Sequence, residues 1–140
     1  MSDAFVLDAS VSLRWFLDHT VPPYANRIKQ SMISGSLAVV PALWHLEMAN
    51  GLVVAQRRGV LSASDVDRSL LDLEQLLAQM IQSDVALVSI RQSLLTARKF
   101  HLSSYDAAYL ETAQRGNLPL ATLDQPLRAA AKQAGVEIVM

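Results

Sequence analysis

Four acidic residues lie at places where a carboxylate can do chemistry. Asp8 and Asp124 each follow a short apolar run and precede a helical pattern. Asp106 begins a helix just before the second of these runs, and Glu47 interrupts the apolar pattern of another helix. Because the carboxyl ends of parallel strands share one edge of a sheet, Asp8 and Asp124 converge if their strands are neighbours. The helices bearing Asp106 and Glu47 would begin near the same edge.

Carboxylates gathered in this way cannot all stay ionised without cations. Their oxygens are hard ligands, which favour Mg²⁺ or Mn²⁺ over zinc. The predicted chemistry is metal-assisted hydrolysis of a phosphodiester, in which a metal ion helps to deprotonate and position a water molecule. The predicted catalytic and metal-binding residues are Asp8, Glu47, Asp106 and Asp124.

Each acid also has a structural interpretation that needs no function. Asp8 suits the N-cap of a helix, and a Glu among apolar neighbours is most often solvated at a helix edge. Asp106 lies three residues after Ser103, the spacing of a capping box. If Asp106 binds a metal it cannot also bond back to the Ser103 amide. We therefore expect Ser103 to cap the helix, whose dipole favours a negative charge at Asp106.

Polar residues near the acids are expected to support them. Ser10 and Thr122 each lie near a strand end, where a hydroxyl can bind a carboxylate or a water molecule. Asn50 lies one turn after Glu47 on the same helix face. The three histidines are not spaced as a metal pair, and the sequence has no Gly-rich phosphate loop and no nucleophile elbow.

Short apolar runs alternate with helical patterns along the whole chain. The runs predict strands over 5–7, 37–40, 85–88, 119–123 and 136–139. Helices are expected over 9–17, 22–32, 41–58, 89–100, 103–115 and 126–133, with one more from Ser62 whose apolar residues extend to Ile81. This alternation is typical of an α/β fold with a mostly parallel sheet covered on both faces. Residues 1–140 are expected to form a single domain.

Composition narrows the class of protein. Hydrophobic residues make up 51% of the 140 residues, and there is no cysteine, which excludes disulfides and a cysteine nucleophile. No apolar run approaches the roughly 18 residues that span a bilayer, so we expect no membrane partner and a cytoplasmic location. The net charge of -1 means that a polyanion would need a local basic patch or metal ions. Candidate basic residues are Arg14, Arg57, Arg58, Arg91, Arg98 and Lys99.

Four short motifs resemble those of the PIN-domain ribonucleases, and among them the VapC-type toxins of type II toxin–antitoxin systems. They are Val6-Leu7-Asp8-Ala9-Ser10, Leu46-Glu47-Met48-Ala49-Asn50, Ser104-Tyr105-Asp106-Ala107-Ala108-Tyr109 and Leu120-Ala121-Thr122-Leu123-Asp124. Each motif is weak alone, but their order and spacing agree with the family across almost the whole chain.

The resemblance implies a PIN-like three-layer sandwich with a five-stranded sheet, and Asp8, Glu47, Asp106 and Asp124 as an Mg²⁺ or Mn²⁺ site. It implies an endoribonuclease toxin, a homodimer, and a cognate antitoxin that covers the helical surface. The broad apolar surface from Val66 to Ile81 also favours a dimer. The alternative is a catalytically inactive scaffold that acts through its helical hairpin, and a phosphatase or deoxyribonuclease would use the same metals.

Overall fold

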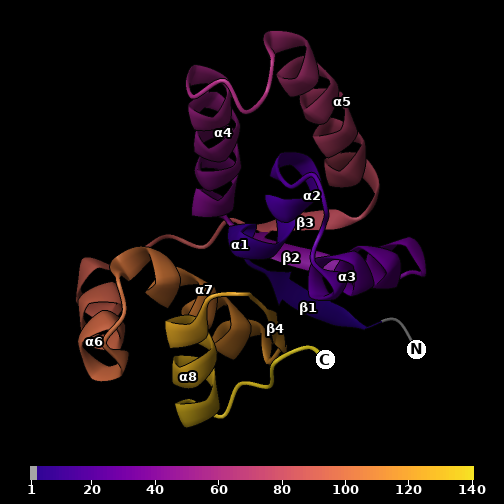
Figure 1. Cartoon of the computed structure of the whole chain (residues 1–140). Helices are drawn as coiled ribbons and strands as arrows, with labels where there is room; N and C mark the ends of the chain where they lie inside the picture. The colour runs from indigo at the N-terminus through magenta and orange to yellow at the C-terminus, as the bar shows by residue number, and fades with distance from the viewer. Residues whose placement is uncertain (1–2) are drawn as a thin grey trace.

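A parallel sheet forms the centre of the protein (Figure 1). The computed structural model describes residues 3–140. The strands are β1 (Ala4–Leu7), β2 (Leu37–Pro41), β3 (Ile81–Asp84) and β4 (Leu120–Ala121), in the order β3-β2-β1-β4. Val6 pairs with Val39 on one side and Leu120 on the other. β1 is therefore an inner strand, and its end lies at the middle of the carboxyl edge.

Helices connect the strands and cover the sheet. They are α1 (Ala9–Ser12), α2 (Arg14–Leu17), α3 (Pro23–Ile33), α4 (Ala42–Arg57), α5 (Ala63–Gln79), α6 (Ile90–Phe100), α7 (Ser104–Gly116) and α8 (Gln125–Gln133). α7 packs against β1, β2 and β4, and α6 lies on its outer side (Figure 1). α4 and α5 extend from the body as a hairpin (Figure 1). Within residues 3–140, no helix is both long enough and apolar enough to cross a membrane.

The α/β class and the parallel sheet are confirmed, but the prediction of five strands was wrong: the described residues form four. Segment 136–139 forms only an isolated bridge between Ile138 and Leu120. Segment 85–88 is an exposed loop, and the third strand begins earlier, at Ile81, which we had assigned to the end of a helix. Short apolar runs give no periodicity that separates a strand from an exposed loop.

The core is built around β1 because both faces of this strand are covered. Val6 and Leu7 are fully buried, as are the large side chains of Trp44 and Tyr109 from α4 and α7. Full burial of a large apolar side chain contributes about 1.5–3 kcal/mol. These residues therefore fix α4 and α7, the helices that carry Glu47 and Asp106, against the sheet.

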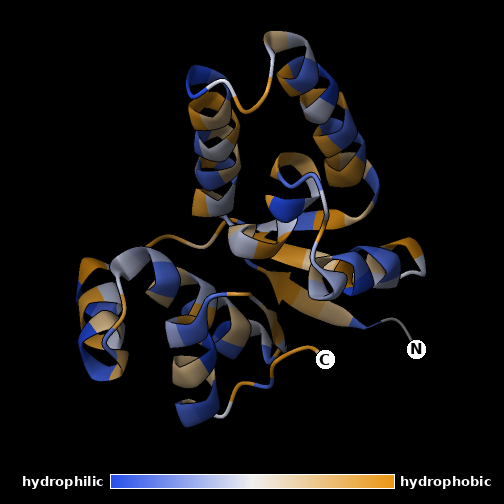
Figure 2. Ribbon diagram, in the orientation of Figure 1, coloured by the Kyte–Doolittle hydropathy of each residue, from blue (hydrophilic) through white to orange (hydrophobic). Residues whose placement is uncertain are grey.

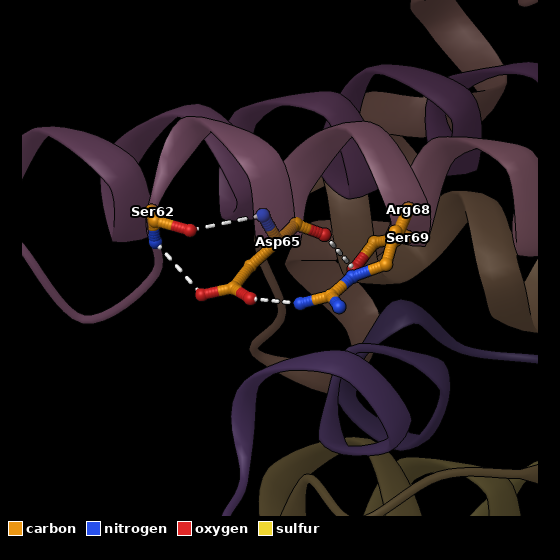
Figure 3. A network of polar contacts seen from close by, with 4 residues as sticks. All are labelled: Ser62, Asp65, Arg68 and Ser69. Atoms are coloured by element: carbon orange, nitrogen blue, oxygen red, sulfur yellow. Dashed lines mark hydrogen bonds and ion pairs between the residues drawn. The ribbon is translucent and has the colours of Figure 1, made fainter.

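The N-terminus of α5 forms a capping box at Ser62, where the sequence predicts the start of a helix (Figure 3). The Ser62 hydroxyl accepts a hydrogen bond from the Asp65 amide, and the Asp65 carboxylate accepts one from the Ser62 amide, both 3.0 Å long. Arg68 pairs with the same carboxylate, and the Ser69 hydroxyl donates to the Asp65 carbonyl oxygen at 2.9 Å. Among the described residues, the carboxylate of Asp65 thus bonds only to residues of its own helix end. Asp106 follows a serine at the same spacing, so the two carboxylates can be compared.

Candidate active site

Strand pairing places the first and last of the four acids together. Leu7 of β1 pairs with Ala121 of β4, so the next residues, Asp8 and Thr122, come side by side at the carboxyl edge. The Thr122 hydroxyl donates a 2.6 Å hydrogen bond to Asp8 Oδ2. The Asp124 amide in turn donates to the Thr122 hydroxyl at 3.0 Å. The Thr122 hydroxyl therefore links the carboxylate of Asp8 to the backbone of Asp124 at this edge.

Two hydroxyl groups hold the carboxylate of Asp8. Besides Thr122, Ser10 donates to Asp8 Oδ2 at 2.7 Å, and the Ser10 hydroxyl accepts the Leu123 amide at 3.0 Å. Asp8 is only 4% exposed, and burial raises the pKa of its carboxyl group. The two hydroxyl groups oppose that rise because they stabilise the ionised form. Both of these side-chain bonds go to Oδ2.

Packing of α4 on α1 positions Glu47. The Trp44 indole donates to the Ser12 hydroxyl at 3.0 Å, and that hydroxyl contacts the Met48 sulfur at 3.1 Å. Gly51 lies further along α4, where a Cβ atom would come within 2.5 Å of a methyl group of Leu13. The close approach of the two helices places Glu47 beside the end of β1.

Tyr109 connects Glu47 to the end of β1, and the sequence analysis did not identify it as a site residue. Its hydroxyl donates to Glu47 Oε1 at 2.6 Å and accepts the Ala9 amide at 3.3 Å. Burial raises the pKa of this hydroxyl far above its usual range, so it remains a proton donor. The sequence feature that could have indicated Tyr109 as a site residue is its position three residues after Asp106, on the same face of the helix.

Asp106 differs from Asp65 although both follow a capping serine at the same spacing. The Ser103 hydroxyl accepts the Asp106 amide at 3.1 Å, as predicted. The return bond from the Ser103 amide, which Asp65 makes with Ser62, is not present. Burial, followed by the charges of Asp124 and Asp8, raises the pKa of Asp106 to about 6. The carboxylate of Asp106 is thus close to the other acids and does not complete a capping box.

The four predicted acids therefore lie near one another. Burial is the main cause of the raised pKa of Glu47, and the charges of Asp8 and Asp106 raise it further. Asp124 also caps α8, because its Oδ2 accepts the Leu127 amide at 2.9 Å. Asp124 can therefore cap α8 and still serve as a metal ligand, since the cap uses only one of its two carboxylate oxygens.

The supporting residues separate into two groups. Ser10 and Thr122 contact Asp8 as predicted, whereas Asn50 is exposed on α4 and forms no hydrogen bond to the acids among the described residues. Arg14 pairs with Asp18 at 2.6 Å. Arg57 and Arg58 are exposed at the far end of α4, about 15 Å along the helix from Glu47. The remaining candidates, Arg91, Arg98 and Lys99, are exposed on α6.

The donor chemistry of the site fits a hard divalent cation. Its ligands would be carboxylate oxygens. Burial, followed by the charges of neighbouring acids, raises the pKa of Asp8, Glu47 and Asp106. Within residues 3–140, no group of three or more His, Asp or Glu side chains is assembled to hold a metal ion as it stands. Glu47 bonds to Tyr109 and Asp124 caps α8, so binding would require these carboxylates to adjust.

Replacing Asp106 with Asn should stabilise the metal-free protein at neutral pH. The folded-state pKa of about 6 exceeds the ordinary 3.8, so the ionised carboxylate disfavours the folded state above pH 6. This penalty disappears as the pH falls from about 6 to the ordinary pKa of 3.8, because the folded state takes up the proton before the unfolded state does. Solvent screens the half-buried group, so we expect a Tm increase of about 2–4 °C in EDTA. The increase should vanish near pH 4, and a variant equal to wild type at neutral pH would contradict the prediction.

Replacing Tyr109 with Phe should destabilise the fold. The ring is kept, but Glu47 loses its donor and the buried Ala9 amide loses its acceptor. An unsatisfied buried group costs about 1–3 kcal/mol, so urea unfolding should show a loss of that size with an unchanged m-value. Tyr105→Phe is the matched control, since that side chain is 66% exposed. Equal stability of the two variants would argue against a role for the Tyr109 hydroxyl.

Comparisons with known proteins agree with this fold. The crystal structure of PAE2754 from Pyrobaculum aerophilum is similar, with a TM-score of 0.69 and 20% sequence identity over 93% of this chain and 86% of that one. The crystal structure of FitAcB from Neisseria gonorrhoeae has a TM-score of 0.67 and 15% identity, and the match covers 97% of this chain and 96% of that one. At these identities the similarity concerns the fold alone.

No curated protein matches the sequence. The family profile of the PIN domain matches residues 5–133, a range that includes all four acids, Ser10, Thr122 and Tyr109. With nearly the whole chain matched, this protein belongs to the PIN domain family.

Proposed function

We propose that this protein is a metal-dependent endoribonuclease that hydrolyses RNA phosphodiester bonds. The supporting observation is the gathering of Asp8, Glu47, Asp106 and Asp124 at one sheet edge, where burial and mutual repulsion raise the pKa of three of them. PIN domains are generally nucleases, and a negatively charged site can approach a phosphodiester only if cations neutralise it. RNA as the substrate follows from the resemblance to the VapC-type toxins.

The four carboxylates would hold Mg²⁺ or Mn²⁺, each by an oxygen that its structural bonds leave available. When bound, the metal would supply an activated water and stabilise the charge on the phosphate. Ser10 and Thr122 fix Asp8 through its Oδ2 atom. Tyr109 fixes one oxygen of Glu47 and leaves the other. The hydroxyl groups would thus orient the carboxylate ligands.

The alternative is an inactive PIN-fold scaffold. The α4–α5 hairpin extends from the body and offers a surface for a partner (Figure 1). All four acids are present, however, and Ser10, Thr122 and Tyr109 hold two of them by buried or half-buried hydrogen bonds. A scaffold has no need for these desolvated carboxylates, so the enzyme is the better proposal.

As a VapC-type toxin, the protein would also be neutralised by a cognate antitoxin that binds its helical surface. We further propose a homodimer. The surface expected for it on α5 is smaller than the sequence indicated, because Leu73 and Ile81 are buried and Leu70 and Leu71 are the large exposed apolar residues of that helix.

Asp8→Asn and Asp106→Asn should each reduce RNA cleavage in Mg²⁺ by at least about 100-fold while the fold is retained. Cleavage of labelled RNA, labelled DNA and a small phosphate ester should be measured side by side, together with circular dichroism. Asp67→Asn is the matched control, because Asp67 is an exposed acid on α5. Full RNA cleavage by both site variants would refute the assignment. Preferential cleavage of DNA would indicate a deoxyribonuclease, and preferential cleavage of the ester a phosphatase.

Light scattering should give a dimer mass for the purified protein at micromolar concentration. Leu70→Asp with Leu71→Asp should yield a monomer, since two charges would be buried in an apolar contact. Ile33→Asp on α3, also an exposed apolar position, serves as the control. A monomeric wild-type protein would count against the homodimer.

A further inference from the structure

The apolar side chains of α6 face outward. This helix packs against α7 through the small buried residues Ser93 and Thr96, whereas Ile90, Leu94 and Leu95 are 87%, 52% and 48% exposed. The preceding loop adds Val85, Leu87 and Val88, which are all exposed. Figure 2 shows this hydrophobic character on the loop and on α6. A helix normally turns its apolar side to the core, so an exposed patch of this kind indicates a binding surface.

Val88, Ile90 and Leu94 of this patch line a groove. This groove, which we term the α6 groove, has a volume of about 560 Å³. Its lining includes Leu43, Val88, Ile90, Leu94 and Tyr105. Tyr105 directly precedes Asp106, and Leu43 lies one helical turn before Glu47. The groove is therefore lined in part by α4 and α7, the two helices that carry Glu47 and Asp106.

The charges on α6 are unlike those of the whole chain. α6 carries Arg91, Arg98 and Lys99 and has no acidic residue, although the net charge of the protein is -1. Arg91 and Arg98 are seven residues apart and share an exposed face with Leu94 and Leu95. This surface thus combines an apolar groove and an exposed aromatic ring with flanking cations, which is the pattern of a single-strand nucleic-acid site.

A second copy of the chain fits this face less well. In an antiparallel contact of two α6 helices centred on Leu94 and Leu95, Arg91 of one copy would face Arg98 of the other. Like charges opposed in this way are unfavourable. Single-stranded RNA supplies phosphates for the cations and flat bases for the groove.

We propose that the α6 groove binds a nucleobase of single-stranded RNA next to the phosphate held at the acidic site. Tyr105 stacks on the base, and Arg91 and Arg98 contact flanking phosphates. This inference rests on the proposed function and adds a substrate subsite to it.

The role of Tyr105 can be tested by binding in the absence of cleavage. Fluorescence anisotropy of a labelled short single-stranded RNA in EDTA gives Kd. Tyr105→Ala should raise Kd by about tenfold, because base stacking on an aromatic ring is lost. Tyr105→Phe keeps the ring and should bind like wild type. Circular dichroism of both variants should be unchanged, since the side chain is 66% exposed.

The role of the arginines can be tested by salt dependence. Arg91→Ala and Arg98→Ala should each weaken binding and reduce the slope of log Kd against log salt by about one. The matched pair Arg57→Ala and Arg58→Ala removes exposed charge at the far end of α4 and should leave the slope unchanged.

The outcomes separate the subsite from the proposed function. Absence of RNA binding by the wild type, or equal Kd values for wild type and Tyr105→Ala, overturns the subsite even if RNA is cleaved. Groove-dependent binding without any Mg²⁺-dependent cleavage supports the subsite and defeats the nuclease proposal. If Leu94→Asp lowers the mass in light scattering and leaves the RNA Kd unchanged, the face is a subunit interface and the subsite is overturned.

Discussion

The concentration of negative charge at the carboxyl edge of the sheet is the constraint on which the rest of the structure depends. Parallel pairing of β1 with β4 places Asp8 beside Thr122, and Glu47 and Asp106 come from α4 and α7. Burial and mutual repulsion both disfavour the ionised carboxylates. Hydroxyl donors and the N-termini of α7 and α8 partly offset these effects. A divalent cation would relieve the unfavourable free energy of the ionised carboxylates that these interactions do not offset.

This constraint explains why two serine–aspartate pairs with the same spacing have different roles. Ser62 and Asp65 complete a capping box, and Asp65 spends its carboxylate on its own helix and on Arg68 (Figure 3). Ser103 caps α7 in the same way, but the carboxylate of Asp106 does not return to the Ser103 amide. The first acid lies at the tip of the hairpin, where only its own helix can use it. The second lies beside Asp8 and Asp124. Local spacing is the same, and the surroundings determine the role.

If the protein binds RNA as proposed, α6 would help a chain with little net charge to accommodate a polyanion. The helix lacks acids, exposes apolar and cationic side chains together, and lines a groove with Tyr105 of α7. Metal ions would neutralise the phosphate-facing side of the site, and the cations on α6 would act on the flanking strand. Stability and function also compete here: the desolvated acids and the exposed apolar patch are both unfavourable in the isolated protein.

The sequence alone determined the class of fold, most helix boundaries, the positions of Asp8, Asp106 and Asp124 at element ends, and the position of Glu47 within a helix. Hydrophobic periodicity and capping residues are local signals that can be recognised without the fold. It also identified Ser10 and Thr122, which follow strands as the acids do. It misplaced β3 and predicted a strand over 136–139, because short apolar runs look alike whether they pair or not. Only the tertiary structure revealed Tyr109 as the link between Glu47 and Ala9, excluded Asn50 from the hydrogen bonds of the site, and turned the apolar face of α6 outward. Those features depend on contacts between residues distant in the chain, and no local pattern encodes which of two helix faces meets the core.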